Sequence, residues 1–333
     1  MEDFIKLLGK ANKVYKENFD NSVTFERAIF FSWYCELGDC KYCYMSTQHK
    51  RIKDPEKARR STASLIAEAV VCKEMKWKIS FLAGGYRAYE LKGFHELAKR
   101  ISDAYGDKLW LNIGALSKDE LEEFKDVSKG VCAAIEVINP ELRKKICPSK
   151  PIDEMVDMFD YAENLKYEKA ITIILGLGES IEDFELLKKF IKKNKISKVS
   201  FYSLNPHKGT VYEDKPSPSS IYQATWIAKT RVAFPKIKIL AGMWSYRVNA
   251  LGLQLLAGAN SFSKFPAIKL FNSKESKNIE EEVKSAGRVL KSKLTGKVEV
   301  DINKNVKDLD LPKDLKKQVK NKLESYIKKM NSD

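Results

Sequence analysis

The chain has 333 residues, of which 44% are hydrophobic and 32% charged, so it can bury a core and is too apolar to stay disordered. Its net charge of +15 favours anionic partners but is spread along the chain, as on an ordinary solvated surface. No apolar run reaches the roughly 18 residues of a membrane span, and the acidic pair Glu2-Asp3 near the start is unlike a signal peptide. We therefore expect a soluble protein of the cytoplasm that binds no membrane.

Apolar strands alternate with amphipathic helices after a leading helix at 2–18. The expected strands are 27–33, 78–82, 108–113, 130–135, 170–175, 198–204, 237–241 and one near 260–261. The expected helices between them are 55–77, 91–104, 118–127, 152–165, 181–193, 221–234 and 246–257. A run of about eight such units predicts an α/β protein with a (β/α)8 TIM-barrel fold.

Three parts are expected along the chain: a helical leader at 1–24, the barrel at 25–272, and an α-rich extension at 273–333. The extension should hold helices 279–292 and 313–329 around a strand at 297–301. Active sites of such barrels lie where strands end and loops begin, so the residues that follow the strands are the candidates for chemistry.

Three of the six cysteines, Cys35, Cys40 and Cys43, stand on one loop directly after the first strand, with Cys-x4-Cys-x2-Cys spacing. Three thiolates can hold three irons of a [4Fe-4S] cluster and leave the fourth iron open to a chelating molecule. A zinc site with His49 as the fourth ligand is the alternative. Cys72 and Cys147 are interpreted as a packing residue and a free thiol.

This loop, the aromatic Tyr42 before its last cysteine and the pair Gly84-Gly85 after the second strand resemble the radical S-adenosylmethionine (SAM) superfamily. The resemblance implies that the three cysteines bind a [4Fe-4S] cluster and that SAM chelates its open iron. Reductive cleavage of SAM would yield a 5'-deoxyadenosyl radical that abstracts a hydrogen atom from the substrate. The usual spacing in the superfamily is Cys-x3-Cys-x2-Cys, one residue shorter in the first gap.

Further segments resemble the parts of these enzymes that contact SAM. Gly84-Gly85 is similar to the GGE motif, with Tyr86 in place of the acid, and residues 172–179 are similar to a GxIxGxxE motif. The carboxylate of SAM would pair with Arg143 or Lys150, because Met155 stands where relatives carry an arginine. The residues that the resemblance assigns to SAM are Tyr42, Gly84, Gly85, Glu136, Asn139, Ile174, Gly176, Glu179 and Met243.

Biotin synthase itself needs further cysteines for a second cluster, and only Cys132 lies near such a place. The chain is most similar to the HmdB/HcgA family, whose usual first cysteine gap is five residues. That family is associated with biosynthesis of the iron-guanylylpyridinol cofactor of [Fe]-hydrogenase in methanogens. Another maturase or metabolite-modifying enzyme of the biotin synthase/HydE type is the neighbouring alternative.

The resemblance implies a small, anionic substrate inside the barrel, an electron donor of the ferredoxin or flavodoxin type, and other cofactor-biosynthesis proteins as partners. Candidates for contacting the substrate are Tyr86, Arg87, Asn205, His207, Trp244, Ser245 and Arg247. A zinc-stabilised nucleic-acid-binding protein is the alternative of another class. The sequence lacks the clustered basic face and stacking aromatics of nucleic-acid modules, so we expect no nucleic acid as a partner.

Overall fold

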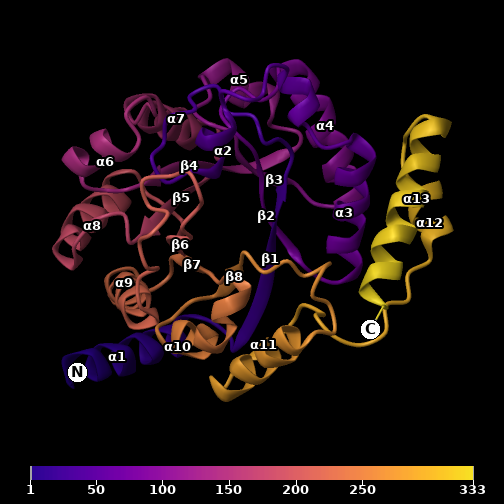
Figure 1. Cartoon of the computed structure of the whole chain (residues 1–333). Helices are drawn as coiled ribbons and strands as arrows, with labels where there is room; N and C mark the ends of the chain where they lie inside the picture. Colours follow the sequence, from indigo (N-terminus) through magenta and orange to yellow (C-terminus); the bar gives the residue numbers. More distant parts are fainter. Residues whose placement is uncertain (1, 333) are drawn as a thin grey trace.

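A closed barrel of eight parallel strands forms the centre of the computed structural model, which describes residues 2–332 (Figure 1). The first strand pairs with the second on one side and with the eighth on the other, which closes the ring. The strands are β1 (Ser22–Phe30), β2 (Lys78–Ala83), β3 (Leu109–Asn112), β4 (Ser128–Glu136), β5 (Glu168–Leu175), β6 (Lys198–Ser203), β7 (Lys238–Gly242) and β8 (Ser261–Ser263). The predicted α/β barrel is confirmed.

The helices lie on the outer side of this barrel, except the short one in the loop after β1, which lies over the barrel (Figure 1). They are α1 (Glu2–Asn18), α2 (Tyr44–Gln48), α3 (Thr62–Glu74), α4 (Leu91–Tyr105), α5 (Lys118–Glu123), α6 (Pro140–Ile146), α7 (Asp153–Asn164), α8 (Phe184–Lys193), α9 (Ser220–Ala233), α10 (Leu251–Leu256), α11 (Lys274–Ser285), α12 (Ile302–Lys307) and α13 (Lys313–Met330). Among residues 2–332, no helix combines the length and the apolar character needed to cross a bilayer.

Several predicted ends of strands and helices were wrong, each for a different structural reason. The first strand starts at Ser22, inside the expected leader. Its first residues pair with a short strand from the tail, so the strand begins earlier in the chain than predicted. The helix expected at 55–77 begins with a separate 3-10 turn, and Ser61 then caps α3. The short helices α2 and α6 lie inside loops, where the hydrophobic pattern is too short to predict a helix.

The tail also differs from its prediction. Its first helix, α11, ends before Gly287, whose φ of +69° suits glycine, and the strand β9 (Val289–Leu290) follows. This strand pairs with Ser22 and Val23 at the start of β1, and no strand forms at the expected 297–301. The helix α13 packs on α3, outside the ring of barrel helices (Figure 1).

The leading helix α1 packs against α9 and is held there by aromatic and cationic side chains. The guanidinium of Arg288, from the tail, lies 3.4 Å from the centre of the Tyr15 ring, and that of Arg231, from α9, lies 4.6 Å from the Phe19 ring. Leader, barrel and tail therefore share buried contacts, while the expected domain boundaries stay a prediction.

A buried carboxylate, Glu68 on α3, ties the barrel to this outer layer. It receives Arg27 of β1 and Arg60 from the loop before α3, each at 2.6 Å. Tyr326 of α13 joins the group through Ser64 at 2.8 Å and Arg60 at 3.3 Å. Burial alone would raise the pKa of the Glu68 carboxyl, but the two arginines hold it below its ordinary value.

Replacing this carboxylate should destabilise the fold. Glu68→Gln leaves two partly buried arginines without their counter-charge, so we expect the free energy of unfolding to fall by about 3 kcal/mol. Urea unfolding followed by circular dichroism at neutral pH measures the loss. Glu185→Gln, which breaks an exposed pair with Lys188, is the control and should cause no measurable loss. Equal effects of the two substitutions would contradict the role of Glu68.

Candidate active site

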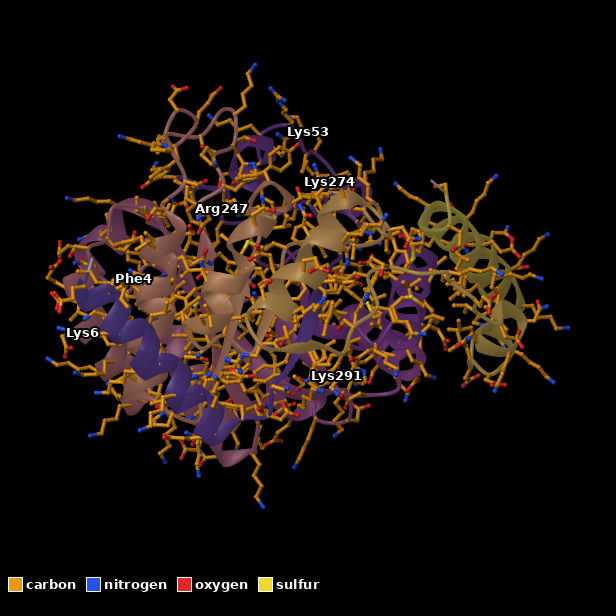
Figure 2. All side chains as sticks on the ribbon, turned by 90° about the horizontal axis from the view of Figure 1, so that it is seen from below. Phe4, Lys6, Lys53, Arg247, Lys274 and Lys291 are labelled. Carbon is orange, nitrogen blue, oxygen red and sulfur yellow. The ribbon has the colours of Figure 1, made fainter. Side chains whose placement is uncertain are left out.

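A cavity of about 1440 Å³ lies at the carboxyl ends of the strands. Its wall comes from β1 and the loops after β1 and β2, from β5 and β6, and from the segments after β7 and β8. Lys53, on this wall, lies at the same end of the barrel as Arg247, and Lys291 lies toward the other end (Figure 2). Protein pockets for small ligands typically measure about 300 to 1,000 Å³, so this one has room for a cofactor together with a small molecule.

The loop after β1 brings all three predicted cysteines, Cys35, Cys40 and Cys43, to the cavity wall. The backbone N–H of Cys43 donates to the carbonyl of Cys40 at 3.1 Å, so these two lie on one tight turn. Lys41 donates its backbone N–H to the carbonyl of Ile146 at 2.9 Å, which anchors the turn to the end of α6. The loop is therefore held in place by backbone hydrogen bonds.

The thiols of this loop differ in their surroundings. The buried Cys147 thiol hydrogen-bonds to Cys40 and lowers the pKa of the Cys40 thiol. Burial raises the pKa of Cys43 to about 11, because the loss of water outweighs the opposing effects of the Met45 backbone and the Lys150 ammonium. Cys72 and Cys132 are fully buried elsewhere in the barrel wall, where burial raises the pKa of both. Only the loop cysteines therefore face the cavity.

The zinc alternative is not favoured by the position of His49. Its Nδ1 lies 2.9 Å from the carbonyl oxygen of Cys35, and its ring packs over Gly38 and stacks near Tyr34. Across residues 2–332, no three His, Cys, Asp or Glu side chains converge closely enough to hold a single ion. A four-iron cluster spreads its thiolates over three different irons, so it needs no such convergence.

The two glycines at the end of β2 lie against the cysteine loop. A Cβ at Gly85 would stand 1.9 Å from the carbonyl oxygen of Tyr34 and 2.7 Å from the Cα of Cys35. A Cβ at Gly84 would stand 2.4 Å from the ring of Phe31. Glycine at both positions therefore allows the strand end to approach the loop that carries the cysteines.

Glu136 and Lys150 form a buried ion pair on the cavity wall, at the end of β4. The Lys150 ammonium lies 2.8 Å from Oε1 of Glu136, and the Thr172 hydroxyl donates to Oε2 at 3.4 Å. Glu136 has a φ of +64°, a strained conformation for a residue with a side chain. The carboxylate of Glu136 raises the pKa of Lys150 despite its burial, so the ammonium stays charged.

Arg143, the other cation expected near SAM, is used structurally. Its guanidinium donates to the carbonyl of Ile135 and to that of Lys150, the latter at 3.1 Å, and it is buried behind the cavity wall. Met155 does line the cavity. Of the two cations proposed from the sequence, the structure therefore brings only Lys150 to the site.

The structure brings many of the other predicted residues to the same wall. Those that line the cavity are Tyr42, Gly84, Gly85, Tyr86, Glu136, Ile174, Asn205, His207 and Trp244. The predicted residues that do not line it are Arg87, Asn139, Gly176, Glu179, Met243, Ser245 and Arg247.

Three of the residues off the wall shape neighbouring loops. Asn139 caps α6 by accepting from the backbone of Leu142, and its amide donates to Asp183 at 2.9 Å. The Glu179 carboxylate accepts the backbone N–H groups of Gly176 and Leu177 at 2.7 and 2.9 Å. These polar atoms already form hydrogen bonds within the protein. Contact of these residues with SAM stays a prediction.

The remaining residues off the wall lie in other surroundings. Arg87 is exposed beside a second cavity of about 620 Å³, and Met243 is buried in the core. Ser245 and Arg247 lie on a 3-10 turn after β7. Burial lowers the pKa of Arg247. Their contact with substrate stays a prediction.

Among the side chains of the cavity wall that sequence reasoning missed are Tyr202 of β6 and Lys264 directly after β8. Lys264 could have been found from its position directly after the eighth strand. The predicted site residues follow earlier strands only. Tyr202 lies inside a strand, and only the barrel geometry shows that its ring faces inward.

Comparison with known proteins identifies the family. A model of the radical SAM superfamily matches residues 30–191, which include the cysteine loop. An uncharacterized protein of Methanocaldococcus jannaschii is 38% identical over 99% of this chain and 96% of its own length. The chain belongs to the radical SAM superfamily.

Two more distant proteins are also similar to this chain, one in sequence and one in fold. A 3-methylornithine synthase of Methanosarcina barkeri is 25% identical to this radical SAM protein over 78% of the chain and 74% of its own length. The crystal structure of methylornithine synthase (PylB) has the same fold, with a TM-score of 0.72 and 22% identity, covering 86% of this chain and 89% of that one.

The protein is therefore a radical SAM enzyme, and members of this superfamily use a [4Fe-4S] cluster and SAM. The donor set on the cavity wall fits these cofactors: three thiols on one loop, and a carboxylate and an ammonium at the end of β4. The cavity is also large enough for SAM beside a second small molecule.

Adding a methyl group at Gly85 should disturb the cysteine loop. In Gly85→Ala the new Cβ would overlap the backbone at Tyr34 and Cys35, so the loop must shift. We expect iron bound after anaerobic reconstitution to fall below about half of the wild-type content, since overpacking of this kind moves backbone. Iron analysis and absorbance of the cluster measure the effect.

Gly93→Ala is the matched control, because a Cβ at Gly93 meets nothing within 4 Å and the residue lies within α4. This variant should keep its full iron content and gain up to about 1 kcal/mol from helix propensity. Full iron content in Gly85→Ala would show that the close approach of the glycine to the loop has no role.

Proposed function

We propose that this enzyme binds its cluster through Cys35, Cys40 and Cys43 and binds SAM beside them, at the mouth of the barrel. The observation that carries the proposal is the joint placement of the three thiols and the Glu136–Lys150 pair on one cavity. Cluster and SAM, when bound, supply a 5'-deoxyadenosyl radical that takes a hydrogen atom from the substrate. A reducing compartment such as the cytoplasm suits the free thiols, and a ferredoxin or flavodoxin is the proposed electron donor.

The protein's own residues have separable roles in this proposal. Glu136 and Lys150 are close enough to each other to receive the amino and carboxylate groups of one amino-acid moiety, that of SAM. The aromatic ring of Tyr42, half-buried beside the cysteines, covers part of the thiols against water in this proposal. Asn205, His207 and Trp244 line the cavity after β6 and β7 and contact the substrate in this proposal.

For the substrate we propose the role of the HmdB/HcgA family, namely a small precursor of the iron-guanylylpyridinol cofactor. The Gly-Gly-Tyr and Glu-x-x-Asn-Pro segments and the lengthened first cysteine gap support it. The test is to offer candidate pyridinol precursors to the reduced enzyme with SAM and to follow the mass of each compound. A mass change that depends on enzyme and SAM supports the role, and conversion of no candidate counts against it.

A second candidate is another metabolite-modifying enzyme of the biotin synthase/HydE type. The match to 3-methylornithine synthase favours it, since that relative is named for a reaction that yields an amino acid. The same mass measurements with small amino acids in place of pyridinol precursors distinguish the two candidates.

Removing any of the three loop thiols should abolish SAM cleavage. Cys35→Ala, Cys40→Ala and Cys43→Ala each take away one cluster ligand, so 5'-deoxyadenosine formed from SAM and dithionite should fall to background. Chromatography of the products measures it. Cys72→Ala is the control because Cys72 lies in the core and away from the cavity, and it should keep the activity.

Cys147→Ala is a less suitable control, since its thiol hydrogen-bonds to Cys40. A colourless wild-type protein that holds stoichiometric zinc after anaerobic reconstitution would contradict the cluster assignment.

Removing the ammonium on the cavity wall should weaken SAM binding. In Lys150→Met the charge-assisted contact with the SAM carboxylate is lost, and we expect the dissociation constant of SAM to rise by about tenfold or more. Equilibrium dialysis of the reconstituted enzyme with labelled SAM measures it. Lys144→Met, in which an exposed lysine of α6 is changed, should bind SAM like the wild type. Unchanged binding in Lys150→Met would reject this contact.

A further inference from the structure

Two lysines of the cavity wall, Lys53 at the rim and Lys264 directly after β8, form no ion pair among residues 2–332. Glu26 is paired with Lys198 at 2.5 Å, Glu136 with Lys150 at 2.8 Å, and Arg27 with Glu68 at 2.6 Å. Lys264 also lines the cavity, but no carboxylate among residues 2–332 lies within ion-pair distance of it. The Lys264 side chain is exposed, so a ligand in the cavity can reach its ammonium.

The backbone at Lys264 is held in an unfavourable conformation. Its φ is +68°, in the left-handed region that favours glycine or asparagine over lysine. The two neighbours fix this geometry: Ser263 accepts the backbone N–H of Met243 at 2.9 Å, and Phe265 is buried with its ring near Phe25. Strain kept at such a position is typical of residues whose side chain has a task.

Two aromatic rings flank the Lys264 ammonium. It lies 4.9 Å from the centre of the Tyr202 ring and 5.6 Å from that of Trp244. The Trp244 indole is fixed by its hydrogen bond to the carbonyl of Ser203 at 3.1 Å. The Tyr202 ring lies against Gly242, where a Cβ would stand 2.1 Å from it. Ring faces attract a cation without neutralising it, so the charge stays available to a ligand.

The other charges nearby define what this ammonium can bind. Glu26 and Glu136 are occupied by their own lysines and by the hydroxyls of Ser261 and Thr172. Burial and the proximity of Lys264 lower the pKa of His207, which is therefore neutral at neutral pH. The ammonium of Lys264 is therefore available to a ligand, and a carboxylate group matches its charge.

We propose that Lys264 binds a carboxylate group of the small-molecule substrate. This inference rests on the proposed function, and it gives the substrate a chemical class. We assign the carboxylate of SAM to Lys150, beyond β4, and that of the substrate to Lys264, directly after β8, since these two strands lie across the ring from each other. Tyr202 and Trp244 cover the carbon atoms next to the carboxylate, so the bound end of the substrate lies between two ring faces.

Chemical labelling of the full-length, reconstituted enzyme tests the proposal without the natural substrate. Trinitrobenzenesulfonate attaches to unprotonated amines, and peptide mapping by mass spectrometry gives the rate at each lysine. Succinate serves as the carboxylate probe and succinamide as its uncharged counterpart, at equal ionic strength. For about 20 mM probe and a site affinity of about 10 mM, mass action slows the labelling of Lys264 about threefold.

Lys53, an exposed lysine at the rim of the same cavity, is the internal control. We expect succinate to slow Lys264 and not Lys53, and succinamide to slow neither. Equal protection by both probes, equal slowing of Lys53, or no protection at all would overturn the carboxylate site. Full protection of Lys264 by SAM alone would overturn its assignment to the substrate. Iron content and absorbance of the same samples report the cluster separately, so a failure of the proposed function is distinguished from a failure at Lys264.

Discussion

The close approach of two backbone segments positions the site. Gly84 and Gly85 follow β2, and the absence of side chains lets Gly84 lie against Phe31 and Gly85 against Tyr34 and Cys35. Because β1 pairs with both β2 and β8, the cysteine loop that follows β1 is held over the open end of the barrel. The thiols, the Glu136–Lys150 pair and Lys264 all come to one cavity as a consequence of this closure.

Most charged side chains inside the barrel are paired with a side chain of opposite charge. The unpaired ones indicate where a ligand can bind. A buried ion without a partner is costly, so a fold keeps one only where something else gains from it. Glu26 is paired with Lys198 of β6, and Glu68 with Arg27 of β1 and Arg60 of the loop before α3, and both carboxylates contribute to the fold. Lys264 is exposed to the cavity, forms no ion pair among residues 2–332 and lies between two aromatic rings, which suits it to an external ligand.

The tail and the leading helix contribute packing and strand-pairing contacts to the fold. β9 extends the sheet at the start of β1, and Arg288 from the tail covers the Tyr15 ring of α1. The sequence predicted helices in this region and could not show where they attach, because attachment depends on partners far away in the chain. Such contacts include Trp77 with the carbonyl of Lys293 and Ser64 with Tyr326.

The sequence by itself determined the alternation of strands and helices, the barrel and the cysteine loop, because periodicity and ligand spacing are local properties of the chain. It also indicated Gly84-Gly85, Glu136 and most of the residues after strands that now line the cavity. Only the tertiary structure decided that Lys150 and not Arg143 reaches the site. It also decided that Asn139 and Glu179 stabilise their own loops and that the Lys264 side chain faces inward. These outcomes depend on which side chain finds a partner across the barrel, and that is fixed by packing between segments that the sequence keeps far apart.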